Sequence, residues 1–218
     1  MTLIKAYHSC KEEAYNAILK TGAIVTPAVK RGPKNPPPGW DPNTSKFWNF
    51  SFFRPIQPLL YGQWGDNGFV FDSELLIQEF NGCLCYDSFI VYNSDQEEID
   101  KIYSNLIEKY EEWGIRWPKL GPLYGDDALD VLRQLQPALD SFNYTSIKER
   151  SDSEAWLMNL VELKCSVEVP INRAYSHYKQ IPVHTWWQGE RWSDIDPNAE
   201  CIHHSQWESK GYEIRLNK

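Results

Sequence analysis

The chain has 218 residues and a formal net charge of −8, with 42% hydrophobic and 24% charged side chains. This composition is typical of a globular protein and excludes a largely disordered, collagen-like or coiled-coil chain. The longest apolar runs are far shorter than the ~18 residues that a membrane span needs, and the N-terminus lacks the apolar core of a signal peptide. We therefore expect a cytoplasmic protein with no membrane partner, folded as a single domain over residues 1–218.

The charges are distributed unevenly along the chain. Residues 1–60 carry 8 basic and 3 acidic side chains, whereas residues 61–140 carry 5 basic and 16 acidic ones. A basic N-terminal third can present a positive surface to phosphate groups even in an acidic protein. On charge alone, however, solvated surface without a partner is the favoured interpretation.

The hydrophobic pattern predicts short strands interspersed with a few helices. In chain order we expect a strand over 3–7, a helix over 9–22, a proline-rich loop over 30–43, strands over 47–53 and 68–72, a helix over 73–80, a strand over 83–86, helices over 95–113 and 126–139, one long strand or a bent pair over 154–169, and a terminal strand over 212–216. Gly22 is a suitable end for the first helix. The chain after residue 171 is a Trp- and His-rich extension without clear periodicity.

This alternation of elements predicts an α+β fold, with a mixed β core and flanking helices. The sequence contains neither the glycine-rich fingerprint of a Rossmann fold nor a P-loop. Nucleotide binding, where it occurs, must therefore use another kind of site.

Five cysteines and no secretion signal predict reduced thiols rather than a disulfide framework. Cys83 and Cys85 lack the spacing and the second pair of a structural zinc site, and alternation along a strand explains them better. His184, His203 and His204, with acidic residues nearby, raise the alternative of a catalytic metal site. Adjacent histidines on a strand point to opposite faces, so both cannot easily bind one ion. We predict no metal site.

Three segments carry residues suited to chemistry. His8 and Ser9 are expected where the first strand ends, and a histidine there can hydrogen-bond a ribose hydroxyl or a carboxamide. Arg54 follows the aromatic residue Phe53 and precedes a proline-fixed turn, which suits a grip on a phosphate or a planar ring. Glu154 directly precedes apolar residues, so we expect its carboxylate to be partly desolvated at a cleft edge. Each of these residues taken alone is more often a surface or capping group.

In this order along the chain, the three segments resemble an ADP-ribosyltransferase, and more narrowly the DarT-type DNA ADP-ribosyltransferase toxins. The first family motif, His with Ser or Thr followed by an Asn-Leu-x-x-Ile-x-x-Gly-like helix, is similar to His8-Ser9 and residues 16–22. The second, roughly Tyr-Phe-x-x-Arg-x-Pro-Met-Leu-Tyr, is similar to residues 52–61, with Arg54 two residues before the family's arginine position. The third, an Ala-Glu pair before an apolar strand, is similar to residues 153–157.

The resemblance covers residues 4–170 and implies an ADP-ribosyltransferase-like fold that uses NAD as a co-substrate. Breaking the bond between nicotinamide and ribose develops oxocarbenium character, which a nearby carboxylate stabilises. The resemblance implies that Glu154 is this catalytic carboxylate and also a candidate base for the acceptor. It implies that Arg54 meets a phosphate or the acceptor.

The resemblance also implies an NAD-binding set. In it, His8 anchors the ribose on the nicotinamide side and Ser9 contacts the carboxamide. Phe53 or Tyr61 stacks on the ring, and Gly22 closes the motif's helix.

The acceptor implied by the resemblance is a base in single-stranded DNA, modified by a toxin or phage-defence effector whose candidate partner is an antitoxin protein. Lys30, Arg31 and Lys34 would then face the pyrophosphate or a nucleic-acid strand. Two alternatives stay open. The same chemistry could act on RNA or protein, or the chain could be a non-catalytic, aromatic-rich binding module in which His8 and Glu154 lie far apart.

Overall fold

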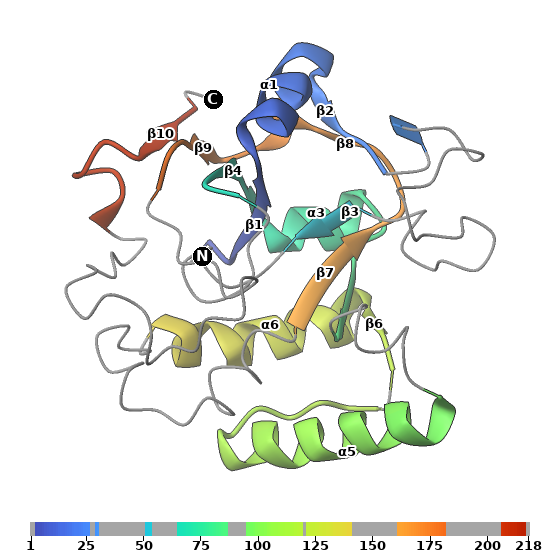
Figure 1. Cartoon of the computed structure of the whole chain (residues 1–218). Helices are drawn as coiled ribbons and strands as arrows, with labels where there is room; N and C mark the ends of the chain where they lie inside the picture. Colours follow the sequence, from blue (N-terminus) through green and yellow to red (C-terminus); the bar gives the residue numbers. More distant parts are fainter. Residues whose placement is uncertain are drawn as a thin grey trace, which may run out of the picture.

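The computed structural model describes residues 3–26, 29–30, 51–53, 65–86, 95–119, 121–140, 161–181 and 206–216. In these ranges the strands form two four-stranded sheets and a two-stranded ribbon, with helices around them (Figure 1). The predicted α+β class is therefore confirmed. No helix in the described ranges is long and apolar enough to cross a membrane.

The first sheet, sheet A, contains four antiparallel strands in the order β1-β4-β9-β10. These strands are β1 (Lys5–Cys10), β4 (Asn67–Asp72), β9 (Ser176–Tyr178) and β10 (Glu213–Arg215). β9 and β10 belong to the extension after residue 171, so the described part of this extension completes the sheet that the N-terminal strand begins. The sequence predicted β10 but not β9, which lies in a segment without clear periodicity.

The second sheet, sheet C, is also antiparallel and has the order β3-β7-β5-β6. It contains β3 (Ser51–Phe53), β7 (Val161–Cys165), β5 (Cys83–Tyr86) and β6 (Leu123–Tyr124). A separate ribbon pairs β2 (Ala23–Ile24) with β8 (Val169–Pro170). β7 and β8 are the described part of the strand or bent pair predicted over 154–169, and they correspond to the bent pair.

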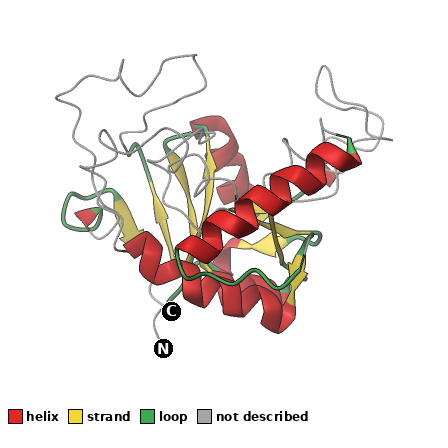
Figure 2. Ribbon diagram, turned by 90° about the horizontal axis from the view of Figure 1, so that it is seen from below, coloured by secondary structure: helices red, strands yellow, loops and turns green. Residues whose placement is uncertain are grey.

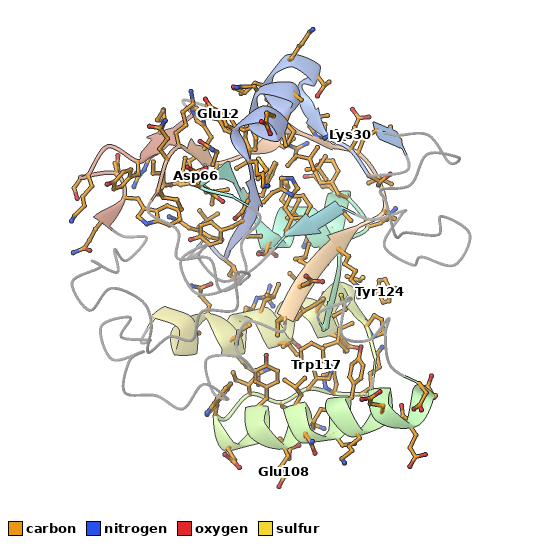
Figure 3. All side chains as sticks on the ribbon, viewed as in Figure 1. Glu12, Lys30, Asp66, Glu108, Trp117 and Tyr124 are labelled. Carbon is orange, nitrogen blue, oxygen red and sulfur yellow. The ribbon has the colours of Figure 1, made fainter. Side chains whose placement is uncertain are left out.

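Each predicted helix is present. They are α1 (Glu12–Thr21), α3 (Ser73–Glu79), α5 (Gln96–Glu112) and α6 (Gly125–Asp140). Seen from below, the long helices lie in front of the strands (Figure 2). Trp117 is buried and its ring stacks on Tyr110 of α5 at a centroid distance of 6.0 Å, and Figure 3 shows it between α5 and α6.

The boundaries of α1 confirm one prediction and correct another. The helix ends at Gly22, whose φ of +78° is left-handed and whose N–H donates to the carbonyl oxygen of Ile18 at 2.8 Å. The helix begins at Glu12, not at Ser9 or Cys10. Both of these residues belong to β1, which continues past its predicted end because its backbone pairs with β4, a partner that lies far along the chain.

The principal core lies between the two sheets and the helices, and a smaller core lies on the other face of sheet A. Alternation along β1 separates them, because Ala6 and Cys10 face the principal core whereas Tyr7 faces the smaller one. The smaller core consists of Tyr7, Val70, Tyr178, Ile181 and Trp207, with Tyr212 packed against it.

Candidate functional site

The candidate site lies where β1 of sheet A contacts β3 of sheet C. The ring of His8 on β1 lies with its centroid 5.5 Å from that of Phe53 on β3, and Phe53 meets Phe71 edge-on at 5.4 Å. His8 is half-buried, whereas Phe53 is fully buried. The structure therefore brings together two of the residues predicted from sequence. Phe53 supports His8 and has no exposed face for a ligand ring.

His8 lies within β1 and not at its end, which corrects the predicted position. It pairs with Phe69 of β4, and Phe69 pairs with His177 of β9. Directly paired residues point to the same face of a sheet. The three side chains therefore form a row across sheet A, with a histidine at each end.

Tyr15 of α1 packs over this row. Its ring stacks on Phe69 at a centroid distance of 5.0 Å and an interplanar angle of 19°, and its hydroxyl forms a short hydrogen bond with Nδ1 of His177. Burial raises the pKa of Tyr15 to about 12, and burial together with nearby Lys179 lowers the pKa of His177. The phenol stays protonated and the imidazole neutral near pH 7, and the tautomer of His177 sets which of the two groups donates.

Sequence reasoning missed His177 as a member of this site. The residue lies in a segment without clear periodicity, and only strand pairing brings it level with His8. Tyr15 had a signal in the apolar face of its helix, which indicates burial. Nothing in the sequence indicates that its hydroxyl reaches a residue 162 positions away.

Ser9 lies on the opposite face of β1 from His8, because consecutive strand residues alternate. Its hydroxyl lies 2.7 Å from that of Tyr178 in a buried hydrogen bond. The ring of Tyr178 crosses Gly68, where an added Cβ would lie 2.3 Å from the tyrosine hydroxyl oxygen and from the His8 carbonyl oxygen. Gly68 is thus required by this close approach. The structure does not bring the side chains of His8 and Ser9 together.

Gly22 has a structural position at the end of α1. Besides its left-handed conformation, its carbonyl oxygen accepts a hydrogen bond of 2.9 Å from the N–H of Ile171. This bond joins the end of α1 to the chain that follows the β2–β8 ribbon.

The remaining predicted residues, Glu154, Arg54 and Tyr61, lie outside the described residues, as do most of the proline-rich loop over 30–43 and its basic residues Arg31 and Lys34. Arg54 directly follows Phe53 in the chain, and Glu154 precedes β7. Lys30 is described and exposed. It lies near enough to Cys10 for its charge to oppose the effect of burial, which raises the pKa of that thiol to about 12.

Among the described residues, no three His, Cys, Asp or Glu side chains are grouped to hold a metal ion. His184, His203 and His204, the alternative metal residues, lie outside the described ranges. The four described cysteines are free thiols, in keeping with the prediction of reduced cysteines. Comparisons with protein-family models, with curated proteins and with solved structures give no match.

Proposed function

We propose that the protein is an NAD-dependent ADP-ribosyltransferase that modifies a base in single-stranded DNA, as a toxin or phage-defence effector. One observation carries the proposal, namely that the three motif-bearing segments lead to neighbouring strands. β1 carries His8 and contacts β3, which leads into Arg54, and β3 pairs with β7, the strand that follows Glu154. These segments are far apart in sequence, and the fold brings the strands that carry or follow them side by side.

We place the substrate at the border between the two sheets. β1 and β3 are neighbours without a shared hydrogen-bonded ladder, since they belong to different sheets. His8 is half-buried there, with Phe53 packed against its ring. In the proposed complex, a ring nitrogen of His8 hydrogen-bonds a hydroxyl of the ribose.

The proposed reaction exchanges one glycosidic bond for another. The bond between the ribose C1′ of NAD and the nicotinamide nitrogen breaks, and nicotinamide leaves with the bonding electrons. A nucleophilic atom of the acceptor base then bonds to C1′ and loses its proton to Glu154. The carboxylate also stabilises the positive charge that develops on the ribose. His8 holds the ribose while this charge develops.

The charge distribution restricts how an acceptor strand can bind. The whole chain carries −8, so a broad polyanion-binding surface is unfavourable. Lys11, Lys20 and Lys30 are exposed in the basic N-terminal third, where Lys11 precedes α1, Lys20 lies on it and Lys30 follows β2. A strand bound along this limited region makes few phosphate contacts, so we expect a shallow dependence of binding on salt concentration.

The test incubates the purified protein with labelled NAD and separate pools of single-stranded DNA, duplex DNA, RNA and protein. We expect label in the single-stranded DNA pool, and its loss in Glu154→Ala and Glu154→Gln. Glu108→Gln, at an exposed position of α5 (Figure 3), is the matched control and should keep full activity.

Other results of this test would redirect or overturn the proposal. Label in the RNA or protein pool would support the proposed reaction but would show that the acceptor is not single-stranded DNA. Full transfer activity in Glu154→Ala would show that the reaction does not need this carboxylate. No label in any pool and no nicotinamide release would favour the binding module.

A further inference from the structure

A second candidate site lies on sheet C, in a pocket of about 500 Å³ beside β5 and β6. Its volume is in the range that small-molecule sites have. The residues that line it include Ile77, Asn81, Cys83, Tyr124, Gly125 and Ser166. Figure 3 shows Tyr124 in the lower half of the molecule, well apart from Glu12 of α1. None of the residues that line the pocket belongs to β1 or β3, so the pocket is distinct from the border of these strands.

The strand register determines what surrounds the thiol in this pocket. Cys83 pairs with Lys164 of β7 on one side and with Tyr124 of β6 on the other. Cys85, two residues along β5, points to the same face, whereas Leu84 between them points to the principal core. Cys83 is therefore flanked by a second thiol, a phenol and a lysine.

These neighbours all change the pKa of Cys83 in the same direction. The Cys85 thiol, the positive charge of Lys164, the Tyr124 hydroxyl and the Lys164 backbone N–H all favour the thiolate of Cys83, and together they outweigh burial and lower its pKa. The Cys85 S–H also lies 3.5 Å from the carbonyl oxygen of Glu162. Its proton can turn from this carbonyl to Cys83 once Cys83 ionises.

The pKa values of the other described thiols change in the opposite direction. Burial raises the pKa of Cys10 and of Cys165 to about 12, and burial also raises that of Cys85. The thiolate is the nucleophilic form of cysteine. Within the described part of the chain, Cys83 is thus the thiol whose surroundings favour reaction.

We propose that Cys83 is the attacking thiol of a thiol–disulfide exchange site that takes small, polar disulfides into the pocket beside β5 and β6. The Cys83 thiolate attacks one sulfur of the disulfide, and a new S–S bond forms between them. The original S–S bond breaks, and the other half leaves as a thiolate that takes a proton from water. The disulfide is itself the oxidant, so no further reactant is needed.

The pocket favours this class of ligand over a bulky one. Cys83 is only 4% exposed, so a large protein disulfide cannot approach its sulfur closely. Asn81 and Ser166 add polar groups to the wall of the pocket. A small disulfide with polar ends matches this combination.

The test treats the reduced full-length protein with glutathione disulfide and locates the adduct by peptide mapping over time. We expect Cys83 to react at least tenfold faster than Cys10 and Cys165 in the folded protein. The pH midpoint of its reaction should fall below the ~8.5 of an ordinary thiol. Tyr124→Phe and Cys85→Ala should each raise this midpoint, whereas Cys10→Ser, the matched control, should leave it unchanged.

Three outcomes would overturn the proposal. They are equal rates at all thiols, an adduct on Cys201 without one on Cys83, and a pH midpoint unaffected by both Tyr124→Phe and Cys85→Ala. Because the mapping is done on the natural sequence, a variant that fails to fold does not remove the test. Transfer of ADP-ribose is not a readout here, so the result is independent of the proposed function.

Discussion

The two faces of β1 place neighbouring side chains in different surroundings. On one face, His8 is half-buried in a row with Phe69 and His177 and is supported by Phe53. On the other face, the hydroxyl of Ser9 is closed in a buried hydrogen bond with Tyr178. Both faces of β1 are thus packed against a core, and the face of His8 differs in carrying a side chain that is only half-buried. Substitutions on the two faces should separate activity from stability.

The largest effect on stability is expected from Trp207→Ala on the closed face. Trp207 is fully buried, and its ring packs against Tyr7 and Tyr178 at centroid distances of 5.7 and 5.1 Å. Removing such a ring leaves a cavity and costs about 3–5 kcal/mol. Urea unfolding followed by fluorescence measures the loss. Trp113→Ala, at a partly buried tryptophan, is the matched control and should cost less. Equal losses would mean that the smaller core is not tightly packed.

The next effect concerns the buried hydrogen bond between Ser9 and Tyr178. Ser9→Ala leaves the tyrosine hydroxyl buried without this partner, which costs about 1–3 kcal/mol of the free energy of unfolding. Tyr178→Phe likewise leaves the serine hydroxyl buried without this partner. The double variant removes both groups and should lose less than the sum of the single losses. Additive losses in urea unfolding would show that the hydrogen bond contributes nothing to stability.

A smaller effect, on activity, is expected from His8→Ala on the other face. Loss of one hydrogen bond to the ribose should reduce transfer roughly tenfold, since such a bond contributes about 1.5 kcal/mol at most. The free energy of unfolding should change little because the side chain is only half-buried. Labelled-NAD transfer and urea unfolding measure the two quantities. His177→Ala is the control for loss of a histidine from the same row. A large loss of stability with unchanged transfer would assign His8 to the core.

The sequence predicted most elements of this fold but little of how they meet. Local signals were sufficient for α1 and its end at Gly22, because helix periodicity and a left-handed glycine are properties of neighbouring residues. The expected position of His8 at the end of the first strand was wrong, because β1 continues to Cys10. That position depends on pairing with β4, which local pattern does not contain. The hydrogen bond between Tyr15 and His177 and the opposite orientation of Ser9 also depend on the sheet.

The smallest expected effect is a dependence of stability on pH that arises from His177. Burial and Lys179 lower its pKa in the folded protein, so below the unfolded value of ~6.5 the unfolded chain binds more protons than the folded one. The contribution of His177 to the free energy of unfolding is therefore fully present above about pH 6.5. It falls as the pH decreases toward the pKa of His177 in the folded protein. His177→Gln, which keeps an oxygen to accept from Tyr15, should flatten this part of the profile in urea unfolding between pH 5 and 8. Tyr15→Phe should keep the slope, because the histidine stays buried beside Lys179. If the dependence of stability on pH is unchanged in His177→Gln, it arises from another titratable group. The interpretation of His177 as a neutral, hydrogen-bonded imidazole would then be wrong.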